Sequence, residues 1–333
     1  FRLLGWETPR ARMIAVFSSL LFALHPAQTQ SVTYIVQRME SLSATFYLLS
    51  LMLFIRASSA STLAGRGALY GLTAASYILS FYSKETAITL PAVILLYDYC
   101  FIGRGRPAEM LRKRWPAYAM LGALFMIFTV SIVMPMGGFG DLSEESAGAP
   151  AHVEVGVAAP SQGTTAMAKL TPAQATALSA GFGFKNITPK QYLFTQFNVI
   201  TYYFALLLVP VNQNLDYDFP VAKSLFKAPQ ANPGTALTMP MLPPVVSLAV
   251  LLVIIGLGVY FIARTRKNPG SARRVAAFFI FWFFIILSPT SSVVPIADVI
   301  YEHRIYLPSL GFFTIFTLCV EAAFARLFSG QKA

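Results

Sequence analysis

Charged residues are scarce in this sequence. Only 12% of its 333 residues are Asp, Glu, Lys or Arg, whereas soluble domains contain about 25%. Hydrophobic residues make up 56%, and the mean hydropathy is +0.61. Because a membrane-spanning helix needs roughly 20 mostly apolar residues, the chain has room for roughly eight to ten spans and for no large soluble domain. The composition predicts an integral membrane protein.

Several catalytic signatures are also missing. The sequence contains no Gly-rich phosphate loop, no His-Glu-x-x-His and no Gly-x-Ser-x-Gly, and its three histidines are too scattered to form a metal cage. Its two cysteines, Cys100 and Cys319, lie in apolar segments without the spacing of metal ligands. We therefore expect no zinc chemistry, no nucleotide hydrolysis and no metal site.

The net charge of +11 does not indicate a nucleic-acid partner, because the Lys and Arg residues form short clusters between apolar runs. Such clusters mark cytoplasmic loops under the positive-inside rule. They are Arg10/Arg12, Arg56/Arg66, Arg104/Arg106/Arg112/Lys113/Arg114, Arg264/Arg266/Lys267/Arg273/Arg274 and Arg326/Lys332.

The apolar runs give the order of the predicted helices. A ninth candidate, 190–209, would place the Arg264 cluster on the outside if it crossed the membrane, and it mixes polar with aromatic residues. We therefore interpret it as an interfacial helix. The eight predicted spans are 11–25, 40–56, 67–83, 86–102, 115–134, 244–263, 274–288 and 306–328.

The predicted fold is an all-α polytopic membrane protein with about eight transmembrane helices, an interfacial helix and a large external loop. Residues 1–134 hold the N-terminal spans, 135–243 the external region and 244–333 the C-terminal spans. The part from 137 to 183 is rich in Gly, Ala, Ser, Thr and Pro, so it cannot bury a core of its own. A flexible loop is the simple interpretation, and a lid that orders over substrate is the alternative.

The short external loops contain three basic residues, and each has a carboxylate within two positions. Ionisable groups at membrane depth are costly unless they are paired or face water, so such a cluster indicates a functional site. The alternative is that each pair only anchors a helix end at the headgroup level. The pairs are Arg38/Glu40, Lys84/Glu85 and Glu302/Arg304.

Other polar residues are expected near these pairs: His25, His303, Asp216 and Asp218. Cations bind phosphate oxygens, and carboxylates can take a proton from an attacking hydroxyl, so the set suits a phosphate-bearing substrate and an acid/base step. His25 could instead cap a helix end, and the two aspartates could be solvated loop residues.

Four ordered motifs carry a family resemblance. They are LFALHP (21–26), QRMESL (37–42), SKE (83–85) with TLP (89–91) and LYD (96–98), and EHRIYLPS (302–309). In this order and spacing the chain resembles the membrane portion of the transmembrane and tetratricopeptide-repeat O-mannosyltransferases and their bacterial relatives. The resemblance implies a fold like that of the C-type glycosyltransferase superfamily.

The resemblance also implies a reaction. Those enzymes move a sugar from a polyprenyl-phosphate donor to an acceptor, here a protein Ser or Thr hydroxyl, on the luminal or periplasmic side. Arg38, Lys84 and Arg304 would then stabilise the leaving phosphate. The carboxylates Glu40, Glu85 and Glu302 are the catalytic candidates, which orient these cations or contact the acceptor.

The resemblance leaves two parts of the family pattern unmatched. The family's base lies in a first external loop that would precede Phe1, and the repeat domain would follow Ala333, so we expect a partial chain or a divergent remnant. Two other functions stay open: a non-catalytic membrane subunit of a larger assembly, and a transporter of a phosphate-bearing lipid. The expected partners are membrane lipids, the lipid-linked donor and a protein acceptor. A bacterial inner membrane is preferred to the endoplasmic reticulum membrane.

Overall fold

The described part of the chain is helical. The computed structural model describes residues 8–133, 187–215, 217–231, 235, 237–266, 268, 270–296 and 299–329, and it contains no β-strand in these ranges. The predicted all-α class is thus confirmed for the described residues. The helices are α1 (Thr8–Leu24), α2 (Thr29–Thr33), α3 (Arg38–Ser58), α4 (Leu63–Ser83), α5 (Leu90–Tyr97), α6 (Pro107–Val133), α10 (Pro189–Leu208), α11 (Pro244–Arg264), α12 (Ala272–Leu287) and α13 (Tyr306–Ser329).

Short helical turns extend several of these helices. They are η2 (Pro26–Gln28), η3 (Ile35–Gln37), η4 (Glu85–Thr89), η5 (Asp98–Ile102) and η7 (Glu302–Ile305). With these turns included, five helices among the described residues are long and apolar enough to cross a membrane: Ile35–Ser58, Glu85–Ile102, Pro107–Ile132, Pro244–Arg264 and Glu302–Phe328. Their length and composition are those of a multi-pass helical membrane protein.

Three of the eight predicted spans form helices that are too short or not apolar enough to count as candidate spans. The helices α1 and α12 have 17 and 16 residues, fewer than the roughly 20 that a bilayer core requires. Helix α4 has 21 residues, but its many Gly, Ser and Tyr residues make it less apolar. The count of eight spans therefore stays a prediction.

Helices α3 and α4 form a hairpin whose contact surface is lined by small hydroxyl residues. Ser50 donates a hydrogen bond to the Thr73 carbonyl at 2.8 Å, and Ser43 donates to the Ser80 carbonyl at 3.0 Å. Small residues let two helices approach closely, and their hydroxyls bond across the contact. Glu40 lies three residues before Ser43 on the same buried face of α3, so this seam leads directly to it.

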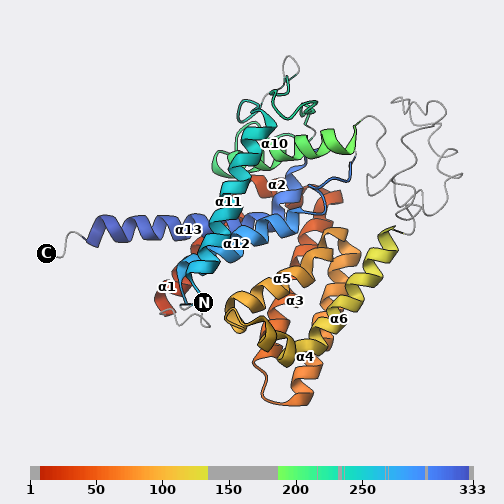
Figure 1. Ribbon diagram of the computed structural model, residues 1–333, viewed down its shortest axis with the longest axis vertical. Coiled ribbons are helices and arrows are strands. Elements are labelled where there is room, and N and C mark those ends of the chain that lie inside the picture. Colours follow the sequence, from red (N-terminus) through yellow and green to blue (C-terminus); the bar gives the residue numbers. More distant parts are fainter. Residues whose placement is uncertain are drawn as a thin grey trace, which may run out of the picture.

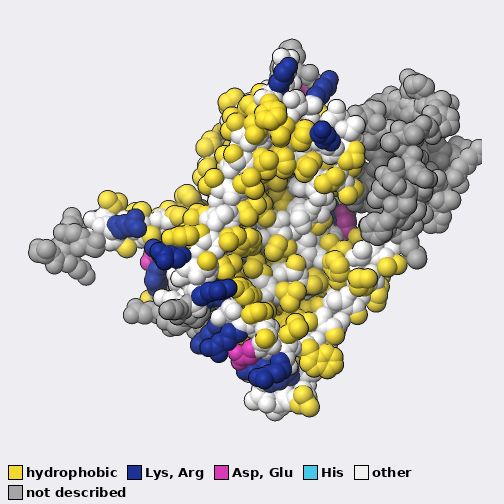
Figure 2. All heavy atoms as spheres, in the orientation of Figure 1, with side chains coloured by type: hydrophobic (Ala, Val, Ile, Leu, Met, Phe, Trp, Pro, Cys, Tyr) yellow, Lys and Arg dark blue, Asp and Glu magenta, His cyan; other side chains and the backbone are white. Residues whose placement is uncertain are grey.

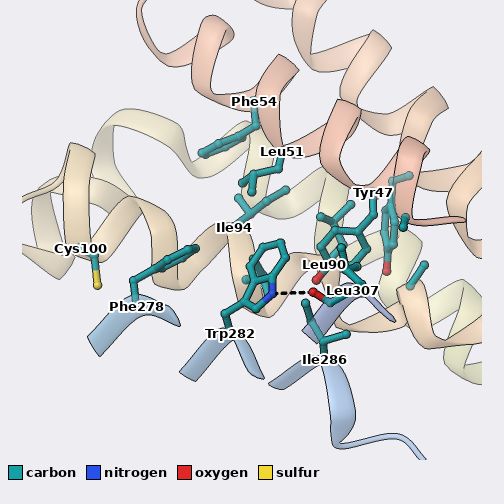
Figure 3. Packing of buried hydrophobic residues seen from close by; sticks show 14 of the residues in the cluster. Tyr47, Leu51, Phe54, Leu90, Ile94, Cys100, Phe278, Trp282, Ile286 and Leu307 are labelled. Atoms are coloured by element: carbon teal, nitrogen blue, oxygen red, sulfur yellow. Dashed lines mark hydrogen bonds between the residues drawn. The ribbon is translucent and has the colours of Figure 1, made fainter. Parts of the chain in front are cut away.

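Helix α12 connects the α3–α4 hairpin to the start of α13. Trp282 is fully buried, and its indole nitrogen donates to the Leu307 carbonyl at 3.1 Å (Figure 3). The Tyr47 ring meets the Trp282 ring edge-on, with centroids 5.8 Å apart. Because Leu307 lies two residues after the end of η7, this core fixes the position of Arg304 relative to α3.

Helix α10 lies at one end of the molecule (Figure 1). Thr188 and Gln191 form a capping box that starts it, with the Gln191 amide donating to the Thr188 hydroxyl at 3.2 Å. More than half of its 20 residues are buried, and it is not among the five candidate spans. The tyrosines Tyr192, Tyr202 and Tyr203 pack it against Ile300 and Ile305, so α10 covers the segment that leads into η7.

The positive charges of the described residues lie mostly at one end. Figure 2 shows Lys and Arg side chains along the lower left margin, over the end of α13 and over the α5–α6 and α11–α12 connections. These are the positions of the basic clusters in the sequence. Which side of a membrane this end faces remains a prediction. The segment 137–183, predicted as a loop or lid, lies outside the described residues.

Candidate functional site

An ion pair joins α3 to the end of α4. The Lys84 Nζ lies 3.1 Å from Glu40 Oε1, and the two side chains are only 13% and 9% exposed. Glu40 stands in the first turn of α3, and the extended backbone of Lys84 (φ −156°, ψ 131°) ends α4 beside it. The sequence paired Lys84 with Glu85 and Glu40 with Arg38. In the structure Lys84 pairs with Glu40 across the hairpin instead.

Arg304 faces the same place from η7. It is 9% exposed, and it lines a small pocket together with Glu40. Glu40 also lies within electrostatic range of Lys84, Glu85 and Arg304. Of the three predicted cations, the structure therefore brings Lys84 and Arg304 together around Glu40. The full lining of the pocket is Glu40, Ser43, Ala44, Tyr47, Thr86, Ala87, Ile286, Arg304, Leu307 and Pro308.

Tyr192 and Tyr203 of α10 lie near Arg304, and neither was among the site residues predicted from the sequence. The Arg304 Nη1 donates to the Val299 carbonyl at 3.3 Å, and its guanidinium lies 5.4 Å from the centre of the Tyr301 ring. The Tyr192 hydroxyl donates to the Thr290 carbonyl, and that of Tyr203 donates to the Tyr301 carbonyl, both at 2.8 Å.

These phenols stay protonated at neutral pH. Burial raises the pKa of Tyr192, and burial raises the pKa of Tyr203 to about 12, although the nearby charge of Arg304 acts in the opposite direction on both. They therefore serve as hydrogen-bond donors and not as bases. Tyr192 and Tyr203 are 11 residues apart, about three helical turns, so the shared face was readable from the sequence.

Glu302 is turned toward the loop that follows α10. Its carboxylate accepts hydrogen bonds from the Gln213 side-chain amide at 2.8 Å, the Asn214 backbone amide at 3.1 Å and the Tyr217 hydroxyl. The predicted Glu302/Arg304 ion pair is not among the ion pairs between described residues. Glu302 thus holds the loop close to the start of α13.

Replacing Glu302 by glutamine is expected to loosen this loop. The glutamine NH₂ would replace one carboxylate oxygen and so face at least one of the three donors, and the others would lose a charged acceptor, which costs about 1–3 kcal/mol. Hydrogen–deuterium exchange of residues 213–217 measures the effect and should become faster. The control is Glu321→Gln, because Glu321 bonds the exposed Arg10 and its loss should leave that exchange unchanged. Unchanged exchange in Glu302→Gln would contradict this role.

The two histidines of the predicted site, His25 and His303, are held by hydrogen bonds. His303 is buried, its backbone amide donates to Gln30 Oε1 at 2.7 Å, and its ring stacks on Tyr301. His25 precedes η2, and its Nδ1 accepts a hydrogen bond from the Ala27 amide at 3.2 Å, which is the cap role that the sequence left open. Burial lowers the pKa of His25, so its ring is neutral at neutral pH, as this accepted bond requires.

The remaining predicted site residues are not part of the lining of this pocket or lie outside the described residues. Arg38 is exposed and lines a separate, open groove of about 820 Å³ with Met39, Leu42 and other apolar residues. Glu85 is half-buried at the start of η4, and Asp218 is exposed. Asp216 is outside the described residues.

A second buried ionic cluster lies near the opposite ends of the helices. Asp98 is fully buried, and it accepts hydrogen bonds from Arg114 Nη2 at 2.6 Å, from Arg114 Nε and from the Tyr118 hydroxyl. Arg114 leaves helical geometry (φ −128°, ψ 17°) two residues before Pro116 in α6. The carboxylate oxygens of Asp98 are both bonded, which indicates a structural role.

Asp98→Asn is expected to destabilise the protein by about 3–5 kcal/mol, because it leaves the buried Arg114 charge without its partner. Thermal unfolding in detergent measures this loss. Glu109→Gln is the control on α6, the helix that carries Arg114, since Glu109 pairs with the exposed Lys113 and its removal should leave the melting temperature almost unchanged. Equal melting temperatures for both variants would show that the Asp98 cluster does not hold the fold.

The described chain is thus a helical membrane protein with a buried ionic cluster beside a pocket at one end of its helices. It is similar to Protein O-mannosyl-transferase Tmtc3 of Drosophila melanogaster, with 29% identity over 99 residues. The match covers 29% of this chain and 11% of the fly protein. No protein-family profile and no solved structure matches the chain. This similarity is a distant suggestion of the O-mannosyltransferase family and hints at glycosyltransferase activity.

Proposed function

We propose that this chain is part of a membrane glycosyltransferase. It moves a sugar from a polyprenyl-phosphate donor to an acceptor hydroxyl, of a protein Ser or Thr, on the periplasmic or luminal side. The observation that supports this most is the convergence of Arg304 and the Lys84–Glu40 ion pair on one pocket. The partial similarity to a protein O-mannosyltransferase supports the same chemistry.

The cations match the charge that develops in this reaction. The acceptor oxygen bonds to the anomeric carbon of the sugar, the bond from that carbon to the lipid phosphate breaks, and the phosphate leaves with both electrons. Preorganised cations at a low-dielectric site stabilise such a leaving group strongly. Arg304 can bind two phosphate oxygens at once, and Lys84 supplies a second charge whose direction Glu40 fixes.

The hydroxyl proton requires an acceptor. Glu302 is bonded to the loop after α10, and Glu40 is held by Lys84. Glu85 lies near Glu40 and forms no ion pair with another described residue, so it is the candidate base within this part of the chain. The Glu302 contacts would act at a distance, by keeping Gln213, Asn214 and Tyr217 beside η7.

The direct test is a transfer assay with the complete protein in proteoliposomes. The probes are polyprenyl-phosphate carrying a radiolabelled mannose and a peptide rich in Ser and Thr. We expect label on the peptide, released as mannose by β-elimination. Movement of the labelled lipid across the bilayer without transfer would identify a transporter, and neither activity would identify a non-catalytic subunit. Both of these results overturn the proposal.

A further inference from the structure

Two turns that are far apart in the sequence together present seven exposed cations. We name this set the basic patch. Within the described residues of 104–113 and 264–273 the one carboxylate is Glu109, which is already bonded to Lys113 at 2.7 Å and Arg106 at 3.5 Å. Figure 2 shows such side chains gathered at this end of the molecule. The basic patch consists of Arg104 and Arg106 before α6, Arg112 and Lys113 near the start of α6, Arg264 at the end of α11, Arg266 after it, and Arg273 at the start of α12.

One buried side chain joins the two turns. Arg274 is fully buried, and its guanidinium donates to the Thr265 carbonyl at 3.0 Å and to the Tyr99 carbonyl at 3.2 Å. Thr265 ends α11, and Tyr99 belongs to η5, just before Arg104. Carbonyl oxygens do not neutralise the Arg274 charge, so it adds to the positive potential. The two halves of the basic patch are therefore held as a single surface.

Arg104 occupies a backbone position that suits glycine. Its φ is +50°, and the next residue, Gly105, has a φ of +80°. Left-handed geometry is unfavourable for a residue with a Cβ, and glycine is the usual residue there. Arginine at this position therefore adds an exposed charge at a cost to the local backbone.

Aromatic residues indicate the depth of the basic patch in a bilayer. Trp115 in α6 is 62% exposed and lies two residues after Lys113. Tyr260 in α11 is 50% exposed and lies one helical turn before Arg264. Both helices are candidate spans. Because Trp and Tyr of spanning helices are enriched at the headgroup level, these two residues favour a position of the basic patch level with the lipid phosphates.

We propose that the basic patch binds the headgroups of anionic phospholipids, which bridge the α5–α6 turn and the α11–α12 turn and stabilise their packing. The Arg side chains donate to phosphodiester oxygens, two at a time where the geometry allows. Each cation near an anionic lipid surface contributes about a fivefold gain in affinity. The interaction should weaken as salt is raised, because these charges are exposed.

The test measures thermal unfolding of the complete protein in neutral detergent while phosphatidylglycerol or phosphatidylcholine is added. We expect phosphatidylglycerol to raise the melting temperature and phosphatidylcholine to leave it unchanged. The variant with Arg104, Arg106, Arg264 and Arg273 all changed to Gln should bind phosphatidylglycerol several hundredfold more weakly, at about fivefold per charge. Lys223→Gln with Lys227→Gln is the control, because these exposed lysines lie in the loop between α10 and α11.

Two results would overturn the proposal. One is a variant with four substitutions that responds to phosphatidylglycerol as the wild type does. The other is a wild type that inorganic phosphate or a short oligonucleotide stabilises as much as phosphatidylglycerol does. If the variant with four substitutions does not fold, Arg104→Gly gives a separate test. Its melting temperature without lipid and its response to phosphatidylglycerol should change in opposite directions. Without anionic lipid its melting temperature should stay the same or rise by about 2 °C, because glycine accepts the left-handed backbone. The gain on adding phosphatidylglycerol should nevertheless be smaller than in the wild type, and an undiminished gain would overturn the proposal.

Discussion

Sugar transfer by the complete protein is expected to fall about 10²–10³-fold when Arg304 is replaced by alanine, which is the usual loss when one preorganised group that stabilises developing charge is removed. The change should appear mainly in kcat, because the phosphate gains charge as it leaves. Single-turnover transfer from a labelled polyprenyl-phosphate sugar, at saturating donor, measures it directly. Transfer at the wild-type rate with normal donor affinity would end the proposed role of Arg304.

Two variants separate this role from a purely structural one. Arg304→Lys keeps the charge but cannot keep both the bond to the Val299 carbonyl and the planar contact with Tyr301, so it should recover part of the rate. Arg38→Ala removes an exposed cation that lines the outer groove and not the pocket with Glu40. We expect it to change donor affinity more than kcat. Equal losses in kcat for Arg38→Ala and Arg304→Ala would mean that the two cations act at the same place.

The sequence indicated which polar residues lie at the helix ends, but not which residues they contact. Apolar runs and basic clusters predicted a helical membrane protein with polar groups at the helix ends, because these patterns depend on composition along the chain. Pairing Arg38 with Glu40 ignored helix geometry, since side chains two positions apart point to nearly opposite faces of a helix. Glu40 instead shares the buried face that runs through Ser43 and Tyr47, and this 3–4 spacing was visible in the sequence.

Contacts between distant segments could not be read in the same way. The loop that Glu302 holds is 85 to 89 positions away along the chain, and no periodic pattern links the two segments. The burial of α10 has a similar origin. Its mixture of polar and aromatic residues resembles an interfacial helix, but Tyr192, Gln196 and Tyr203 find partners in the segment before α13. A helix with such residues can lie at a bilayer surface or against other protein, and the local sequence alone does not decide between them.

The Glu40–Lys84 pair is expected to separate stability from catalysis. Glu40→Gln or Lys84→Met alone leaves one charge almost buried without its partner, which costs about 3–5 kcal/mol of unfolding free energy. The double variant Glu40→Leu with Lys84→Met removes both charges, so it should regain most of the melting temperature, since replacing a buried ion pair by apolar residues is often neutral.

Transfer should behave differently in the same three variants. If Lys84 stabilises the leaving phosphate, the stable double variant remains slow by about 10²-fold or more, because the site has lost the second cation. If the pair only holds α3 against α4, transfer recovers together with the melting temperature. Thermal unfolding and single-turnover transfer, measured on one preparation of each variant, therefore decide whether this ion pair belongs to the reaction or to the fold.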